Sequence, residues 1–317
     1  MRFDLQPVAK IEVLTLQDNF IDLAAMDSTP VVQRAFPVKD GAIKNSIGAE
    51  HGFSALVTIT ARGTDRSMLF DFGFSQRGAL ANADALGVAL DGVEAFVLSH
   101  GHLDHHGGLA AFIERRGGKE VELILHPAAF RKSRYFKVSD QLKFALPAPN
   151  RGAIERTGVH VVETKDPHPL LDNTLLFLGE IPKKTAFEKG LLRLRYEEGG
   201  KEKWDPTEDD SAIVGHVGGK GLVVLSGCAH SGIVNTVNYA REVTGVDEIF
   251  VVMGGFHLTG ADFEPIIDPT ALALTAMRPR YVVPTHCTGR KAVMEMERQM
   301  PEQFLLNMSG TKMVFAG

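Results

Sequence analysis

At positions 99–108 the chain reads Ser-His-Gly-His-Leu-Asp-His-His-Gly-Gly, which places His100, His102, Asp104 and His105 within six positions. This stretch follows the apolar run 93–98, which is typical of a buried strand. A strand ending in such a loop can turn His100 and His102 to one side and the other pair to the opposite side. Neutral imidazole and carboxylate are good ligands for zinc, iron and manganese. The pattern predicts two neighbouring metal ions at a strand end.

A structural role for the same residues is the alternative to weigh. A single histidine on an apolar strand is more often part of the core than a metal ligand. Here four side chains converge on one loop, and burying them without partners costs about 1 to 3 kcal/mol per group. That cost favours a metal site.

The His-x-His-x-Asp-His string resembles the metallo-β-lactamase superfamily. Three more segments are similar to one subgroup, the 7,8-dihydropterin-6-methyl-4-(β-D-ribofuranosyl)aminobenzene-5'-phosphate synthase-like metal-dependent hydrolases: GCAHSGIVN at 227–235, GGFHL at 254–258 and PTHCTG at 284–289. The resemblance extends from about Ile11 to the C-terminus. It implies an α/β fold, a four-layer αβ/βα sandwich with the metals along one edge of the sheet pair.

The resemblance also implies ligands outside the first loop. His286 follows the apolar run 280–284 and matches the last histidine of the superfamily. That histidine binds the ion that also takes Asp104 and His105. We therefore expect His286 to project from a strand end towards this ion.

The ion at His100 and His102 needs a third protein ligand, for which two histidines compete. His216 lies before a strand, where the superfamily has its third ligand, but Val-Gly-Gly-Lys follows it as in an ordinary hairpin. His230 lies two residues after Cys228. We rank His230 ahead of His216 as the third ligand.

Cys228 stands where most members of the superfamily have a bridging aspartate. A thiolate there can bind one ion and bridge poorly, or Cys228 can be a bystander beside His230. This departure leaves open a single ion or a metal other than zinc. We expect one or two divalent ions, zinc first, with iron and manganese as alternatives.

Other residues are assigned to support or catalysis. Asp71, in Leu-Phe-Asp-Phe-Gly at 69–73, resembles the aspartate of the first superfamily motif. Because ligating histidines commonly donate their other N–H to a carboxylate, Asp71 is an orienting residue, with a turn-forming role as the alternative. Asp104 and His257 are the candidate catalytic residues. His51 and His257 lie beside glycines and can contact substrate or transfer a proton near neutral pH, or lie at the surface.

Composition agrees with a single domain that binds a small molecule. The 317 residues are 44% hydrophobic, which is ample for a core, and we expect one domain over 1–317. The net charge of -5 provides no basic field for nucleic acid, so the expected partner is a small-molecule substrate. The oligomeric state stays open.

The cysteines and the N-terminus indicate a cytoplasmic protein. The two cysteines, Cys228 and Cys287, each lie next to a candidate ligand histidine, which argues against a disulfide framework. The first residues carry no export signal, and no apolar run approaches the roughly 18 to 20 residues of a membrane span. We expect no association with a membrane.

Short apolar runs bounded by turn residues predict strands and alternate with helical patterns. The expected strands are 9–16, 54–61, 67–72, 94–99, 121–126, 160–163, 174–179, 191–196, 212–216, 221–226, 248–253, 280–284 and 313–316. The expected helices are 76–86, 107–116, 235–243, 268–277 and 292–300. The segments 132–158 and 181–210 are less regular, so we expect lids or binding loops there.

The leading hypothesis for function is a metal-dependent hydrolase that acts on a small-molecule ester, lactone or phosphoester. A metal ion lowers the pKa of its bound water, and the hydroxide attacks a carbonyl or phosphoryl centre. Two alternatives stay open. The subgroup label implies a synthase or transferase acting on a pterin or ribofuranosyl-phosphate substrate, and the site also fits a non-hydrolytic redox or ligand-sensing metalloprotein.

Overall fold

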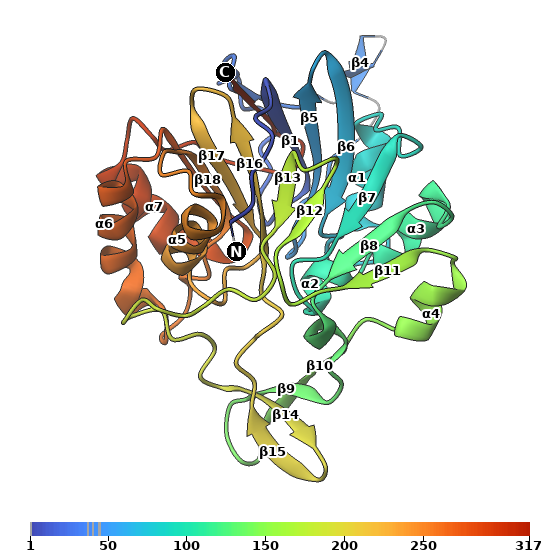
Figure 1. Ribbon diagram of the computed structural model, residues 1–317, viewed down its shortest axis with the longest axis vertical. Coiled ribbons are helices and arrows are strands. Elements are labelled where there is room, and N and C mark those ends of the chain that lie inside the picture. The colour runs from blue at the N-terminus through green and yellow to red at the C-terminus, as the bar shows by residue number, and fades with distance from the viewer. Residues whose placement is uncertain (1, 37, 40, 44–45) are drawn as a thin grey trace.

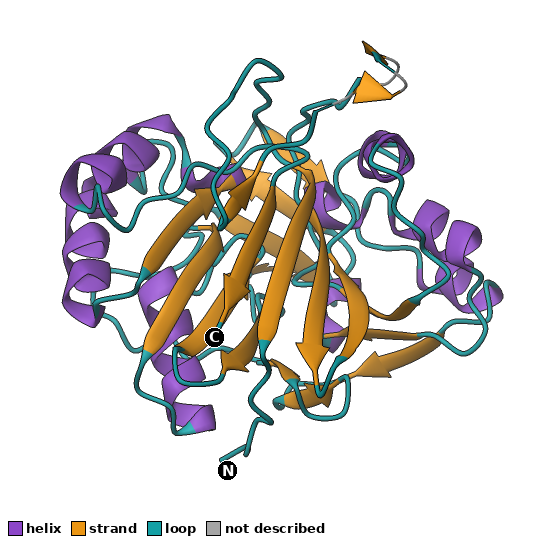
Figure 2. Cartoon of the chain, turned by 90° about the horizontal axis from the view of Figure 1, so that it is seen from above, coloured by secondary structure: helices purple, strands orange, loops and turns teal. Residues whose placement is uncertain are grey.

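Two sheets pack face to face at the centre of the molecule. A computed structural model describes residues 2–36, 38–39, 41–43 and 46–317. Helices cover the outer face of each sheet, and Figure 2 shows the stacked sheets between two groups of helices (Figures 1 and 2). This arrangement confirms the predicted four-layer αβ/βα sandwich.

The first sheet holds the loop of histidines. Within the described residues it has eight strands in the order β11-β8-β7-β6-β5-β1-β20-β2. Strands β6, β7, β8 and β11 run parallel, whereas the others pair antiparallel. The bounds are β1 Lys10–Gln17, β2 Val32–Gln33, β5 Ser54–Ala61, β6 Thr64–Phe70, β7 Val93–Val97, β8 Glu122–Leu125, β11 His160–Glu163 and β20 Lys312–Ala316.

The second sheet holds the later motifs. It has six strands in the described part of the chain, in the order β12-β13-β16-β17-β18-β19, of which β17, β18 and β19 are parallel. The bounds are β12 His168–Leu170, β13 Leu175–Phe177, β16 Ala212–Val217, β17 Gly221–Ser226, β18 Ile249–Gly255 and β19 Tyr281–Thr285.

The helices divide between the two outer faces. Helices α5, α6 and α7 lie on the second sheet, and α1 and α3 lie on the first (Figure 1). The bounds are α1 Gly78–Ala85, α2 Leu103–His106, α3 Leu109–Arg116, α4 Arg151–Arg156, α5 Ile233–Thr244, α6 Ile267–Met277 and α7 Arg290–Gln299. Among the described residues, no helix has the length and apolar character that crossing a membrane requires.

Strand alternation explains why each sheet is buried on both faces. In β6, Met68 and Phe70 point into the layer between the sheets, where they share a core with Phe177 and Met253. Leu69 points the other way, into the core under α1 and α3. Successive side chains of a strand face opposite sides, so a continuous apolar run supplies both layers.

The parallel strands bring the sequence motifs to one edge of the sandwich. The carboxyl ends of parallel strands lie at the same edge of a sheet, which is where ligands bind in open α/β sheets. The loops after β6, β7, β17, β18 and β19 carry Asp71, the 99–108 loop, the 227–235 segment, His257 and His286. Two sheets therefore contribute to one site.

Every strand and helix that the sequence predicts is present, with each end within three residues of its expected position. The expectation for 132–158 and 181–210 was wrong in one respect, because these segments form a third sheet. Its order is β10-β9-β14-β15, and its bounds are β9 Arg134–Lys137, β10 Lys143–Leu146, β14 Leu194–Glu198 and β15 Lys201–Trp204.

The short, charged strands of this third sheet resemble a solvated loop in sequence. Cross-strand ion pairs use those charges, as in Lys137 Nζ to Glu202 Oε1 at 2.9 Å. Several short elements carry no apolar run that would predict them. They are the helices α2 and α4, the two-residue strands β2, β3 Val38–Lys39 and β4 Ala42–Ile43, and the strand β12.

A buried arginine fastens the third sheet to the loop of histidines. Arg134 in β9 is fully buried and donates to Asp205 Oδ2 at 2.7 Å and to both carboxylate oxygens of Asp209, at 2.6 and 2.9 Å. Asp209 Oδ2 in turn accepts from the backbone N–H of Gly101 at 2.8 Å. The position of the third sheet is thus coupled to the backbone between His100 and His102.

We expect Arg134→Met to lower the free energy of unfolding by about 3 to 5 kcal/mol, because it leaves the buried carboxylate of Asp209 without its cation, whereas Asp205 keeps its ion pair with Arg131. Urea unfolding measures the change. Arg115→Met is the control, since Arg115 pairs with Asp84 at the surface and its loss should cost at most about 1 kcal/mol. Equal effects of the two variants would contradict this account of Arg134.

Candidate metal centre

The loops at the sheet edge hold several residues in a strained backbone conformation. Asp71, Ala229, His257 and His286 have φ values of 58, 49, 44 and 46° respectively. This left-handed region is unfavourable for residues other than glycine, and such strain clusters at functional sites. The strained residues follow β6, β17, β18 and β19, one in each loop.

Three histidines form the first donor group. His100 Nε2, His102 Nδ1 and His230 Nε2 lie 3.1 to 3.2 Å from one another. Zn–N bonds of about 2.0 to 2.1 Å place the ligand atoms of a tetrahedral ion about 3.3 Å apart. Burial lowers the pKa of all three rings, that of His102 to about 4, so the rings are neutral. Three such nitrogens cannot satisfy one another by hydrogen bonds, whereas one cation satisfies them all.

The hydrogen-bond network orients His100 for this role. Ser99 Oγ donates to Asp71 Oδ2 at 2.7 Å, so its lone pair accepts from His100 Nδ1 at 2.9 Å. The proton of His100 is thereby held on Nδ1, and the lone pair of Nε2 faces the other two histidines. Metal-binding histidines are commonly oriented in this way.

Asp104, His105 and His286 form the second donor group. His286 Nε2 lies 3.2 Å from Asp104 Oδ2, and His105 Nε2 lies 3.9 Å from the same oxygen. His286 Nε2 is buried and has no hydrogen-bond partner in the described part of the chain. A cation between these atoms would satisfy that nitrogen and the carboxylate together.

In the second donor group, too, hydrogen bonds hold the ring nitrogen of each histidine that faces away from the group. His105 Nδ1 donates to Asp71 Oδ2 at 2.7 Å, and His286 Nδ1 donates to Asn19 Oδ1 at 2.9 Å. Asp71 therefore lies behind His105, a candidate ligand. Asn19 was not identified from the sequence, because a lone asparagine after the first strand carries no metal-binding signal.

The charge at the second group also favours a cation. Burial disfavours a charged ring, yet the carboxylates of Asp71 and Asp104 raise the pKa of His105 to about 9. Burial likewise opposes ionisation of Asp104, but His105 and His286 hold its pKa far below the usual range. A metal ion would replace the proton on His105 as the balancing charge.

Cys228 lies between the two donor groups. Its Sγ is 3.0 Å from His105 Nε2, and it lies within 4.8 Å of the donor atoms of His100 and His230 in the first group and of the whole second group. Burial raises the pKa of the Cys228 thiol, so a metal is needed to bind it as thiolate. The sulfur thus lies within reach of both donor groups.

The remaining histidines occupy distinct places around the centre. His257 joins neither main group, but its ring lies 4.5 Å from that of His230, and its donor atom lies near Cys228 and Cys287. His51 Nε2 lies 3.4 Å from Asp104 Oδ2 and faces solvent. His216 lies on β16 opposite Leu222 and belongs to none of the donor groups among the described residues.

Two adjacent aspartates hold the ligand loops. Asp209 accepts from Gly101 N at 2.8 Å, and Asp210 Oδ2 accepts from Ser231 N at 2.8 Å. Gly101 is required because a Cβ there would lie 2.1 Å from Ala129 O. Both contacts join residues that are distant in the sequence, so no local pattern indicates them.

The residues present fit a divalent metal. One group offers three neutral imidazoles, the other offers a carboxylate with two imidazoles, and a sulfur lies near both. Zinc, iron and manganese all accept such donors. These donors could hold one ion or two adjacent ions.

We expect His102→Ala and His230→Ala to reduce the bound metal per chain, because each removes one nitrogen of the first group. His216→Ala is the matched control and should retain the full metal content. Elemental analysis of protein purified in metal-supplemented medium measures the stoichiometry. Metal loss from the His216 variant with retention in the His230 variant would reverse the assignment.

Cobalt substitution tests the sulfur ligand. We expect the Co²⁺ protein to show a near-ultraviolet thiolate charge-transfer band, which Cys228→Ser removes and Cys287→Ser retains. The band requires a Co–S bond, whereas a bystander cysteine gives none. Absence of the band from the wild-type Co²⁺ protein would exclude Cys228 as a ligand.

Similarity to known sequences agrees with this geometry. The family model of the metallo-beta-lactamase superfamily matches residues 47–286. The 7,8-dihydropterin-6-methyl-4-(beta-D-ribofuranosyl)-aminobenzene-5'-phosphate synthase of Methanocaldococcus jannaschii is 33% identical over 262 residues, 81% of this chain and 87% of that protein. An uncharacterized protein of the same organism is 29% identical over 259 residues, 79% of this chain and 88% of its own length.

Solved structures show the same fold. Tm1679, a metal-dependent hydrolase of the beta-lactamase superfamily, has a TM-score of 0.72 at 24% identity, over 97% of this chain and 100% of that one. YhfI from Bacillus subtilis, a metallo-beta-lactamase fold protein, has a TM-score of 0.51 at 13% identity, over 98% and 100% of the two chains. The family predicted from the sequence motifs is confirmed: the chain belongs to the metallo-beta-lactamase superfamily.

Proposed function

We propose that the protein is a divalent-metal-dependent hydrolase that acts on a small-molecule ester, lactone or phosphoester. The observation that carries the proposal is the pair of adjacent donor groups that share Cys228. Membership of a superfamily that often contains metal-dependent hydrolases supports it. Zinc is the proposed metal, and iron and manganese are alternatives.

A divalent ion at these groups would supply an activated water and stabilise negative charge that develops on the substrate. The protein's own residues set the position and the proton balance of this chemistry. His100 and His105 are held with their outer nitrogens protonated, through Ser99 and Asp71 respectively. The Nε2 atoms of both rings therefore face the centre before any ligand arrives, which reduces the reorganisation needed for catalysis.

His51 is placed to exchange protons at the mouth of the site. Asn19 Nδ2 donates to His51 Nδ1 at 3.1 Å, which leaves the proton of His51 on Nε2 and directed at Asp104 Oδ2. The His51 side chain is 62% exposed, so it can exchange that proton with solvent. Such a residue can protonate a leaving group.

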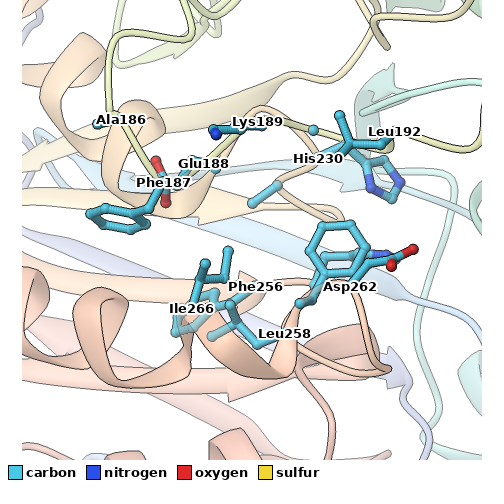
Figure 3. Close-up of a pocket in the computed structure, with 15 residues that line it drawn as sticks. Ala186, Phe187, Glu188, Lys189, Leu192, His230, Phe256, Leu258, Asp262 and Ile266 are labelled. Carbon is cyan, nitrogen blue, oxygen red and sulfur yellow. The ribbon is translucent and has the colours of Figure 1, made fainter.

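A small substrate fits the space beside the centre. A cavity of about 360 Å³ adjoins His230 and His257 (Figure 3). Pockets of about 300 to 1,000 Å³ are typical of small-molecule sites. The size supports a metabolite as substrate and disfavours a nucleic acid or another polymer.

We expect chelator treatment to abolish hydrolysis and re-addition of Zn²⁺ or Mn²⁺ to restore it, because the metal carries the activated water. The assay uses a p-nitrophenyl phosphodiester, a lactone and a thioester, with metal content measured in parallel. His51→Gln should retain the metal but lower kcat by about 10²-fold if it transfers the proton. Full turnover by the metal-free protein would contradict the proposal.

A synthase that forms a pterin compound is the second candidate. The 33% identity over 262 residues to the Methanocaldococcus jannaschii synthase favours it. That protein's name describes a product in which a dihydropterin methyl group is joined to a ribofuranosyl aminobenzene phosphate. The same metal centre would then stabilise a leaving group while the bond to the ring acceptor forms.

Mass spectrometry separates the two candidates. The purified protein is incubated with a 7,8-dihydropterin that carries a leaving group on its 6-methyl carbon, with and without a ribofuranosyl aminobenzene phosphate acceptor. A coupled product that requires the acceptor supports the synthase. Release of the free pterin alcohol at an equal rate with and without the acceptor supports the hydrolase.

A further inference from the structure

The cavity beside His230 has an apolar, partly open lining. Its apolar side chains are Phe187, Leu192, Phe256, Leu258, Phe263 and Ile266. Figure 3 shows Phe187 and Ile266 at the end remote from His230, so the cavity leads away from the first donor group. We call this cavity the aromatic pocket.

The aromatic pocket is built by three segments that are distant in the sequence. The segment 186–192 precedes β14, the segment 229–232 follows β17, and the segment 256–266 connects β18 to α6. Phe263 packs edge to face on His257, with ring centroids 4.7 Å apart at 89°. That contact links the lining of the pocket directly to the residues beside the metal centre.

The aromatic pocket leaves apolar side chains accessible that a hydrophobic core would bury. Phe187, Phe263 and Ile266 are half-buried, and Leu192 is 55% exposed. Large apolar side chains left open in a concave site mark a place where a ligand covers them. Aromatic side chains bind flat rings by stacking or by edge-to-face contact, which is worth about 0.5 to 1.5 kcal/mol beyond burial.

Of the charged side chains that line the aromatic pocket, only Lys189 has no partner among the described residues. Glu188 lines the pocket but accepts from the backbone N–H groups of Val234 and Asn235, both at 2.8 Å. Asp262 is paired with Arg193 at 3.0 Å. Lys189 is exposed and has no hydrogen bond or ion pair to any described residue.

We propose that the aromatic pocket binds a planar aromatic or heteroaromatic group of the substrate, and that Lys189 binds an anionic substituent of that group. The inference rests on the proposed function, because it assigns a place to the substrate of the same metal centre. The volume of about 360 Å³ accommodates one ring or two fused rings with a substituent. The reacting bond then lies on the side of His230 and His257.

Two nearly isosteric probes test the proposal by isothermal titration calorimetry on the metal-loaded protein. The probes are 2-naphthalenesulfonate, which is anionic, and methyl 2-naphthyl sulfone, which is neutral. We expect both to bind, and the sulfonate to bind about fivefold more tightly because of Lys189. Ethanesulfonate, which has no ring, should bind at least about tenfold more weakly than the naphthyl sulfonate.

Pocket variants locate the binding site. Phe187→Ala should weaken both naphthyl probes by about tenfold. Lys189→Met should remove the preference for the sulfonate and leave the affinity for the sulfone. Leu192→Glu, at an exposed position that does not endanger folding, should weaken the sulfonate more than the sulfone. Metal content should stay at the wild-type value in all three.

Matched controls lie outside the aromatic pocket. Lys184→Met changes a lysine of the same segment that pairs with Glu242 at 2.6 Å, and Leu272→Ala changes a 62% exposed side chain on α6. Both should bind the probes as the wild type does. Binding unaffected by all three pocket variants would overturn the proposal.

The experiment also separates this proposal from the proposed function. A protein that binds the naphthyl probes in the pocket but hydrolyses no ester contradicts the hydrolase and supports the pocket. A protein that hydrolyses esters but binds ethanesulfonate as tightly as naphthalenesulfonate contradicts the pocket alone.

Discussion

The carboxylate of Asp71 is the constraint on which the metal centre depends. It is fully buried and accepts from Ser99 N, from Ser99 Oγ and from His105 Nδ1, each at 2.7 Å. Through Ser99 it orients His100 in the first donor group, and it orients His105 in the second directly. One residue thus fixes a ligand in each group, and it does so from a strained backbone conformation with φ of 58°.

That arrangement needs the two sheets to meet closely. Gly227, at the end of β17, has no side chain where a Cβ would lie 2.1 Å from Ser99 Oγ and 2.8 Å from Asp71 Oδ2. The second sheet can therefore place Cys228 and His230 against the first sheet's ligand loop. Buried apolar side chains packed between the sheets keep the two sheets at this distance. The geometry of the site therefore depends on the packing of the core.

The sequence predicted the parts of the structure that depend on neighbours in the chain. The histidine loop spans six positions after an apolar strand, and both signals are local. Asn19 was missed because its role is set by His286, 267 positions away. The same reason applies to the contact of Asp209 with Gly101, 108 positions apart. The choice between His216 and His230 also needed the fold, since only strand order shows which ring reaches His100.

The two donor groups have different neighbours. The aromatic pocket adjoins the first donor group through His230, whereas His51 and Asn19 lie beside the second. A substrate whose ring occupies the pocket would place its reacting bond across the two groups and its leaving group towards His51. The third sheet helps to position the first donor group, because Arg134 in β9 binds Asp209, which accepts a hydrogen bond from the backbone of Gly101.

Anomalous diffraction from crystals of the metal-loaded protein tests the central claim most directly, because it locates each ion independently of activity. The account predicts one ion bound by His100, His102 and His230, a second bound by Asp104, His105 and His286 when both sites are filled, and the sulfur of Cys228 between them. Ions located only at other residues, or no bound ion after titration with zinc, iron and manganese, would contradict it.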